Sequence, residues 1–195
     1  MRDTRPLLLE TDFPPIRRSK LDTVQVNLGY LCNLSCTHCH VNAGPTRTEL
    51  MDTATIDLVL AFLAKNNITS LDMTGGSPEM NPEFRRLVIE ARKLGVNIIN
   101  RCNPTILVEP GYEGLPEFFA EHEITVVASL PCYTEQNVDQ QRGKGVFQDS
   151  IAGLLALNKV GYGQEGSNLE LNLVFNPDEP ALPPAQETLK ADYKK

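Results

Sequence analysis

The sequence predicts an α/β fold: a partial parallel (βα) barrel in which about five βα units are visible. Short apolar runs alternate along the chain with segments whose apolar residues recur at helical spacing. Each apolar run is followed by a loop that contains glycine, cysteine, serine or asparagine. Alternating strands and helices form parallel units with right-handed crossovers, and functional loops follow the strands. The 195 residues are enough for one domain with a real core.

The first two strands flank a helix whose start is marked in the sequence. Alternating apolar residues predict the first strand over 24–28, and a second strand is expected over 68–74. Asp52 predicts the N-cap of the helix between them, because its side chain can accept a backbone N–H of the first turn. The apolar face of this helix consists of Ile56, Val59, Leu60 and Leu63.

The later elements follow the same alternation. Asn81-Pro82 predict the cap and first turn of the next helix, and Gly95 ends it. Its apolar face consists of Phe84, Leu87, Val88 and Ala91. The remaining strands are expected over 96–99, 124–130 and 169–175. A short helix is expected through Phe118 and Phe119, and a longer one, ending at Gly161, through Phe147, Ile151, Leu154, Leu155 and Asn158.

The patterns divide the chain into three segments. Residues 1–22 form an N-terminal extension, and residues 23–176 hold the five βα units. Residues 177–195 form a proline-rich tail, which we expect to lead to a C-terminal region absent from this chain. The prolines of this tail are Pro177, Pro180, Pro183 and Pro184.

Charge and hydropathy narrow the classes of partner. The formal net charge of −7 and the pI near 5.0 argue against nucleic acid or an anionic membrane as the main partner. No apolar run approaches the roughly 20 residues of a membrane helix. The apolar stretch at the N-terminus is also too short for a secretory signal. A cytoplasmic location is therefore favoured. In a reducing compartment, metal binding or catalysis explains clustered cysteines better than disulfides do.

Three of the five cysteines, Cys32, Cys36 and Cys39, lie in the loop after the first strand. An iron–sulfur cube normally takes four thiolates, so a cube held by three keeps one iron open for chemistry. This spacing resembles the signature loop of the radical S-adenosylmethionine (SAM) enzymes. The resemblance implies a [4Fe–4S] cluster, SAM as the second cofactor, and a partial barrel of the radical SAM type.

Other uses of this loop stay open. A structural zinc site would need His38 or His40 as a fourth ligand. The segment 36–40 also matches the C-x-x-C-H attachment sequence of c-type haem, which leaves Cys32 unused and normally requires export. A thioredoxin-like redox pair would not need Cys32 either.

Two further loops complete the expected cofactor site. Two glycines after the second strand let the backbone approach a ligand closely, and the segment Gly75, Gly76, Ser77, Pro78 and Glu79 resembles the GGEP-type loop of radical SAM enzymes, with serine where that loop has glutamate. That loop's backbone holds the amino group of SAM. The region after the fourth strand resembles relatives with an extra cluster domain. There Ser129 is a candidate for the ribose hydroxyls and Arg142 for the SAM carboxylate.

Six segments carry a closer resemblance: 31–33, 39–45, 74–79, 100–103, 129–133 and 172–177. Together they resemble the arsenosugar-biosynthesis radical SAM family, often called ArsS, over nearly the whole chain. The family implies transfer of a 5′-deoxyadenosyl group from SAM to a trivalent methylated arsenical. Asn176 is then a further cofactor-binding candidate. Because trivalent arsenic is soft, Cys102 and Cys132 are candidate substrate ligands, although both can also be small buried apolar residues.

The resemblance also defines departures and rivals. Radical SAM cores usually have six βα units, and the family carries a cysteine-bearing extension, whereas no cysteine follows Cys132 here. We therefore expect a partner, either the missing C-terminal half or a second copy, together with an electron donor such as flavodoxin or ferredoxin. The substrate is expected to be a small molecule. The alternatives are a peptide-modifying radical SAM enzyme, or a SAM- and cluster-binding module without turnover.

Overall fold

The computed structural model describes residues 3, 5–12, 14, 19–177 and 182–194. Five parallel strands form one sheet in the order β1-β2-β3-β4-β5. The strands are β1 (Thr23–Asn27), β2 (Ser70–Thr74), β3 (Asn97–Cys102), β4 (Thr125–Ala128) and β5 (Leu171–Leu173). Consecutive strands are neighbours in space, so the expected α/β fold with about five parallel units is confirmed.

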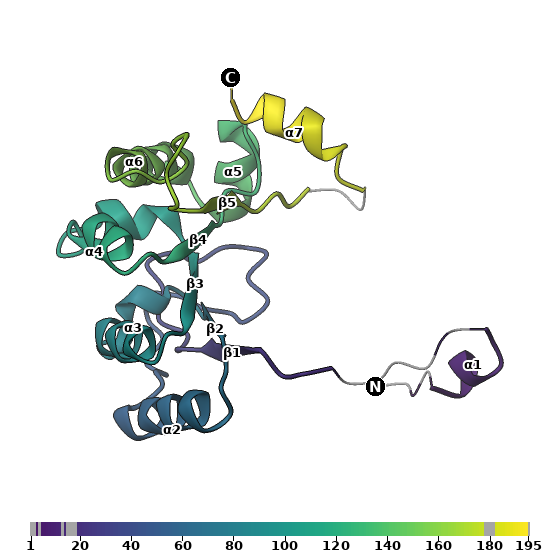
Figure 1. The fold of residues 1–195 in the computed structure, drawn as a ribbon. Coiled ribbons are helices and arrows are strands. Elements are labelled where there is room, and N and C mark those ends of the chain that lie inside the picture. Colours follow the sequence, from purple (N-terminus) through teal and green to yellow (C-terminus); the bar gives the residue numbers. More distant parts are fainter. Residues whose placement is uncertain (1–2, 4, 13, 15–18, 178–181, 195) are drawn as a thin grey trace.

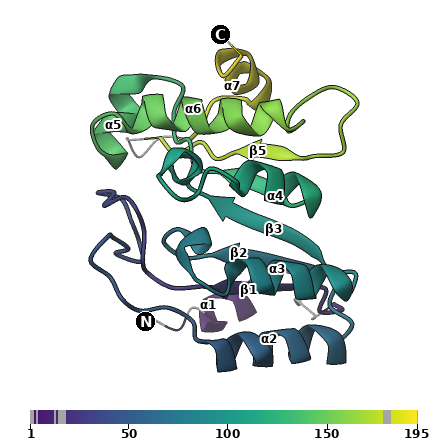
Figure 2. The ribbon, with the colours of Figure 1, turned by 90° about the vertical axis from the view of Figure 1, so that its left-hand side faces the viewer.

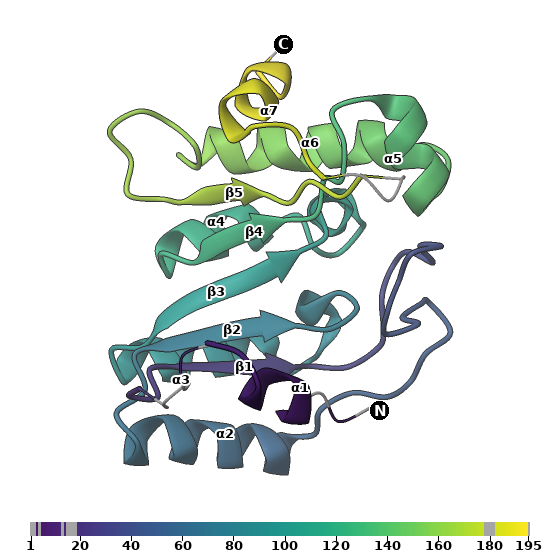
Figure 3. The same ribbon diagram turned by 90° about the vertical axis from the view of Figure 1, so that its right-hand side faces the viewer.

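The helices cover one face of this sheet. Figure 1 shows α2, α3, α4 and α6 stacked along one side, and Figure 2 views the molecule from that side. Figure 3 shows the opposite, open face, with all five strands pointing towards the same edge. The helices are α1 (Arg5–Leu9), α2 (Thr53–Lys65), α3 (Phe84–Lys93), α4 (Leu115–Glu121), α5 (Glu135–Arg142), α6 (Val146–Lys159) and α7 (Gln186–Asp192), with 3-10 helices η1 (Pro78–Met80) and η2 (Pro104–Val108).

Local signals set the starts of both α2 and α3. Asp52 is the N-cap of α2, and its Oδ1 accepts the Thr55 N–H at 2.8 Å, as expected. The expected capping by Asn81 is confirmed, because its Oδ1 accepts the Glu83 N–H at 2.8 Å directly before α3 begins at Phe84. The Asn81 amide also donates to the carbonyls of Leu28 and Met51 at 2.8 and 3.0 Å. It thereby ties the end of β1 to the segment that leads into α2.

Other bounds shift for physical reasons. β3 extends to Cys102, further than expected, whereas β4 ends at Ala128. Helix α5 has no counterpart among the expected helices. Its buried residues are Val138, Gln141 and Arg142, of which only Val138 is apolar. A polar helix of this kind lacks the apolar periodicity on which a sequence prediction depends.

The main core lies between the sheet and its helices. Leu71, Met73, Ile98 and Val126 point from the strands into this layer and are almost completely buried. They pack in one cluster with the buried helix residues Ile56, Leu63, Phe84, Leu87, Phe119 and Leu157. This buried layer holds the strands in place, so that their C-terminal ends form a fixed edge.

The two terminal segments are described in part. Pro180 of the tail and several residues of the segment 1–22 lie outside the described residues. In the tail, the Tyr193 hydroxyl donates to the Leu130 carbonyl at 2.7 Å, and its ring contacts Tyr133 edge-on. Helix α7 therefore packs beside the chain that follows β4. Within the described ranges no helix is long and apolar enough to cross a bilayer.

Candidate active site

A cavity of about 550 Å³ opens at the C-terminal edge of the sheet. The loops after four of the strands, and residues just beyond β5, contribute side chains to it. We call it the strand-edge cavity, and the residues that matter below are Gln25, Cys32, Cys36, Cys39, Gly75, Gly76, Arg101, Asn103, Ser129, Arg142 and Asn176. The structure thus brings together most of the residues expected from the sequence to form one site.

The three clustered thiols all line this cavity and are all free. Cys32 is buried, whereas Cys36 and Cys39 are half-buried. The Ala43 N–H donates to Cys39 Sγ at 3.2 Å, and the Leu34 N–H lies 3.5 Å from Cys32 Sγ. Hydrogen bonds of this type stabilise metal-bound thiolates, so the donor set fits an iron–sulfur cluster.

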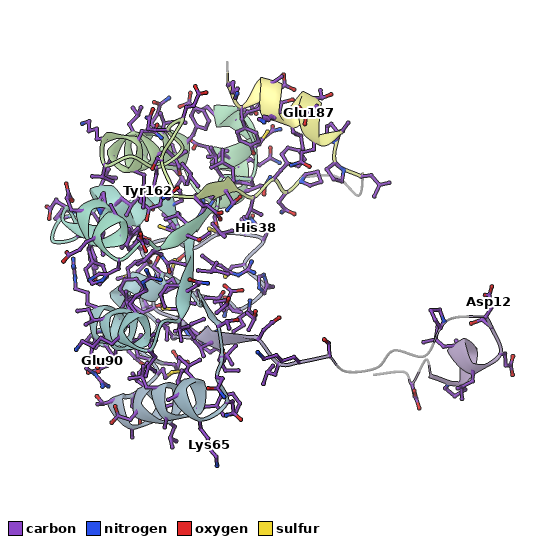
Figure 4. All side chains as sticks on the ribbon, in the orientation of Figure 1. Asp12, His38, Lys65, Glu90, Tyr162 and Glu187 are labelled. Atoms are coloured by element: carbon purple, nitrogen blue, oxygen red, sulfur yellow. The ribbon has the colours of Figure 1, made fainter. Side chains whose placement is uncertain are left out.

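The arrangement fits a cluster better than a single ion. His38 and His40 also line the cavity, and Figure 4 shows His38 on the open side of the sheet. Across the described ranges, however, no three His, Cys, Asp or Glu side chains are placed to hold one metal ion. A structural zinc ion needs four ligands around one centre. In a cube, by contrast, each thiolate binds a different iron, so the thiols can lie further apart.

The two glycines after β2 allow their loop to pack against the cysteine loop. Gly75 has φ +145°, which an L side chain rarely adopts. A Cβ built on Gly76 would lie 2.4 Å from the Leu31 carbonyl oxygen and 2.9 Å from Cys32 Cβ. The Gly76 N–H also donates to the Gly29 carbonyl at 2.9 Å. The glycines therefore set the distance between two walls of the cavity.

Replacing Gly76 with alanine should push the cysteine loop away from the Gly75–Gly76 loop. The clash involves backbone atoms, so we expect a loss of roughly 1–3 kcal/mol in the free energy of unfolding, together with poorer cluster assembly. Denaturant unfolding and iron content measure the two effects. Gly114→Ala is the matched control, because a Cβ there meets nothing within 4 Å. Equal behaviour of the two variants would show that the close packing is unimportant.

Ser77, Pro78 and Glu79 were expected to bind the cofactor, but they do not line the cavity. Pro78 and Glu79 belong to η1 and are buried. The Ser77 hydroxyl lies 3.4 Å from Cys32 Sγ and donates to Asn33 Oδ1 at 3.1 Å. The Ser77 side chain therefore contacts the cysteine loop, whereas the sequence predicted a contact with SAM.

Glu79 is buried on the helix side of the sheet. Its Oε1 accepts the Asn100 amide at 2.6 Å, and its side chain contacts Cys102. Burial raises the pKa of the Glu79 carboxyl, with the hydrogen bonds opposing this shift. Burial, reinforced by the neighbouring Glu79, also raises the pKa of the Cys102 thiol well above its ordinary value. Cys102 is fully buried and faces away from the cavity, so the structure does not support its role as a substrate ligand.

The buried Glu79 predicts a specific dependence of stability on pH. Its raised pKa means that the folded state favours the protonated carboxyl. The contribution of this carboxyl to the free energy of unfolding is therefore complete below its pKa in the unfolded chain, and it is lost as pH rises through its pKa in the folded chain. Relative to Glu79→Gln, the wild type should lose up to about 1.4 kcal/mol per pH unit in this window. Urea unfolding of both proteins from pH 4.5 to 8 measures this. Parallel curves would contradict it, and Glu121→Gln on the surface of α4 is the control.

Arg142 links the loops that follow β3 and β4. It is 6% exposed although it carries a charge. Its Nη1 donates to the Ser129 carbonyl, and its Nη2 donates to Asn103 Oδ1 at 2.7 Å. The Asn103 amide in turn donates to Asn33 Oδ1 at 2.8 Å. One hydrogen-bonded chain therefore runs from Arg142 to the cysteine loop.

Asn33 and Asn103 were not among the expected site residues. Asn33 follows Cys32 directly, and its amide also donates to Thr105 Oγ1 at 2.8 Å and to Glu109 Oε1 at 3.0 Å. Their positions could have indicated a role in the site, because both asparagines follow strands at the edge of the sheet where the cavity lies. Their hydrogen-bond partners could not be predicted from the sequence, because the contacts join residues up to 76 positions apart.

The remaining two expected residues behave differently. Asn176 lines the cavity, and its N–H donates to the Pro131 carbonyl at 2.9 Å. Cys132 is buried in a small apolar cluster beside Val138 and does not line the cavity. Its Sγ lies 3.5 Å from the Asn137 amide. As with Cys102, this placement does not support contact with substrate.

Comparison with known proteins identifies the family. Residues 26–179 match the Radical SAM superfamily. The chain belongs to the radical SAM superfamily. Radical SAM proteins use a [4Fe–4S] cluster and SAM, in agreement with the cofactors expected from the cysteine loop.

Three relatives illustrate the range of radical SAM proteins that the chain resembles. GTP 3′,8-cyclase of Chlorobaculum tepidum is 28% identical over 98 residues, covering 50% of this chain and 30% of the cyclase. The putative peptide biosynthesis protein YydG of Bacillus subtilis is 35% identical over 120 residues, covering 58% of this chain and 36% of YydG. The solved structure of anSMEcpe with bound AdoMet, which is SAM, has a TM-score of 0.63 at 18% identity, covering 80% of this chain and 43% of anSMEcpe. The chain spans less than half the length of each of these relatives.

Proposed function

We propose that this radical SAM protein cleaves SAM reductively in the strand-edge cavity and transfers the 5′-deoxyadenosyl group to a trivalent methylated arsenical. The observation that supports a SAM site most directly is convergence. Three thiols, two glycines, Ser129, Arg142 and Asn176 reach one cavity from separate strands. The arsenical acceptor rests on the ArsS-like segments of the sequence.

Within this proposal each group has a defined task. Cys32, Cys36 and Cys39 hold the cluster, which when bound supplies the electron for SAM cleavage. The backbone of Gly75 and Gly76 lies against the methionyl part of SAM. Ser129 and Asn176 lie against the nucleoside, and the Arg142 guanidinium faces the carboxylate. These groups orient SAM before reaction, which is the main catalytic contribution of a protein in cofactor chemistry.

The overall reaction is balanced in atoms and electrons. The C5′–S bond of SAM breaks, a C5′–As bond forms, and methionine leaves. Arsenic passes from the trivalent to the pentavalent state while the sulfonium becomes a thioether. The net transfer therefore consumes no reductant, so the electron that starts cleavage is returned in each completed cycle.

The experiment is anaerobic reconstitution of the chain with iron and sulfide, followed by SAM, reductant and a dimethylated trivalent arsenical. We expect more 5′-deoxyadenosine than adenosyl–arsenic product from this chain alone. In the described part of the chain, β1 and β5 pair with no further strand, so the site is open to the medium, where C–H or S–H groups of added thiol or buffer can donate the hydrogen atom that completes 5′-deoxyadenosine. Mass spectrometry measures both products. If neither product forms from a loaded cluster, the chain is a binding module without turnover.

A second candidate, modification of a peptide, is favoured by the similarity to YydG, a putative peptide biosynthesis protein. An open sheet face offers room for an extended chain as well as for a small molecule. The same reaction mixture discriminates between the two functions. Replacing the arsenical with a peptide encoded beside this gene should give a mass shift of the peptide only if this second function is the correct one.

A further inference from the structure

Three polar side chains at the strand-edge cavity, Gln25, Asp72 and Arg101, have no role in the proposed binding of the cluster and SAM. We call them the polar row. Arg101 of β3 lies between Asn100 and Cys102, which are buried on the helix side, so its side chain points to the open face. Gln25 of β1 and Arg101 both line the cavity. Asp72 of β2 lies between them.

Asp72 fixes the orientation of the guanidinium. Arg101 Nε donates to Asp72 Oδ1 and Nη2 donates to Oδ2, both at 2.9 Å, while Gln25 Nε2 donates to Oδ2 at 2.7 Å. The Asp72 side chain is only 9% exposed, against 46% for that of Arg101. The Asp72 carboxylate thus accepts hydrogen bonds from three nitrogens of two side chains, and these contacts hold the Arg101 guanidinium in one orientation beside the cavity.

The guanidinium keeps donors for a ligand. No described residue accepts a hydrogen bond from Arg101 Nη1, and an arginine has five N–H groups in total. Because Asp72 balances the charge, the row is close to neutral, so it favours a hydrogen-bond acceptor without attracting every anion. Holding the fork in advance also lowers the entropy cost of binding.

The position of the row relative to the SAM residues suggests its use. Arg101 precedes Asn103 by two residues, and alternate residues of a strand share one face about 6.6 Å apart. Asn103 contacts Arg142, the proposed partner of the SAM carboxylate. Arg101 pairs in register with Val127, two residues before Ser129. The row therefore lies one layer deeper in the cavity than the proposed SAM site.

We propose that Gln25, Asp72 and Arg101 form a subsite that binds an oxygen substituent of the acceptor, a hydroxyl or an oxyanion, through the free N–H groups of Arg101. This inference rests on the proposed function, since it assigns the acceptor's place beside SAM. For a methylated arsenical, the oxygen bound to arsenic is the recognised group. Neither buried cysteine is required for this contact.

The test uses dimethylarsinate, a stable oxygen-bearing analogue of the acceptor, as the probe. Its affinity for the reconstituted full chain with SAM is measured by calorimetry. Arg101→Met should weaken binding at least tenfold while leaving SAM affinity unchanged. Arg101→Lys, which keeps a cation beside Asp72 but loses the fork, should also weaken it. Arg92→Met is the control, because Arg92 pairs with Glu123 on the helix side.

Each outcome decides the inference. Tenfold or greater weakening in Arg101→Met with intact SAM binding, alongside an unchanged Arg92→Met, supports the subsite. Absence of binding to the wild type, or an affinity of Arg101→Met within tenfold of the wild type, overturns it. Dimethylphosphinate should bind through Arg101 in the same way if oxygen is recognised, and its failure to do so would also overturn it. Because these assays involve no turnover, a failure of arsenical adenosylation is detected separately by mass spectrometry.

Discussion

Replacing any one of Cys32, Cys36 and Cys39 with serine should abolish assembly of the [4Fe–4S] cluster. A cube bound by three thiolates already lacks a fourth protein ligand. Removing another thiolate leaves two irons exposed, and a serine hydroxyl is a hard, weakly acidic donor that does not replace a soft thiolate. Cys32 is the most sensitive position, because it is buried and its neighbours Leu34 and Ser77 contact its sulfur.

Iron and sulfide content, together with electron paramagnetic resonance of the reduced protein, measure this effect. The wild type should contain close to four irons and four sulfides per chain, and each variant less than about a tenth of that. Cys132→Ser is the matched control, because Cys132 is buried away from the cavity. A full cluster in any of the three variants would remove that residue from the ligand set. Stoichiometric zinc without sulfide in the wild type would replace the cluster proposal altogether.

Replacing Arg142 with alanine should weaken SAM binding by about 1.5–3 kcal/mol, or roughly 10- to 150-fold. Two effects add. The variant loses a charge-assisted contact to the carboxylate, and it also loses the guanidinium that ties the Ser129 carbonyl to Asn103. The second effect follows from the structure alone, since it connects the loops after β3 and β4.

Arg142→Lys separates these contributions. A lysine keeps the charge but cannot bridge Ser129 and Asn103 with one planar fork. Intermediate affinity would indicate that both effects operate, whereas wild-type affinity would assign the role to charge alone. Lys144→Ala, which removes an exposed cation two residues away, controls for net charge. Calorimetry that gives the same SAM affinity for Arg142→Ala and the wild type, with the fold intact, would exclude Arg142 from the site.

The parts of the site that could be predicted are those encoded within short stretches of sequence. The spacing of Cys32, Cys36 and Cys39 predicts the cluster loop. The glycines after β2 predict a close backbone approach, which the positions of Gly75 and Gly76 confirm. The order of apolar runs predicts the parallel sheet, because a buried strand and an amphipathic helix each have a local periodicity. The Asp52 cap is likewise a contact within three residues.

The parts that could not be predicted depend on contacts between distant residues. Nothing near Ser77 in the sequence indicates that its hydroxyl faces Cys32 and Asn33 rather than SAM. The direction of Cys102 depends on the length of β3, since adding one residue to a strand reverses the face of a side chain. Asn81 illustrates the same point, because beyond the local cap its amide also donates to carbonyls 30 and 53 residues away.

The sequence by itself therefore determined the superfamily, the sheet and the thiol loop, because these follow from local spacing and periodicity. Only the tertiary structure decided which side chains reach the cavity. It turned Cys102 and Glu79 towards the helices, buried Cys132 beside α5, and placed Arg101 with Asp72 on the open face. The physical reason is that strand register and loop packing select the face of each side chain, and both arise from contacts across the whole sheet.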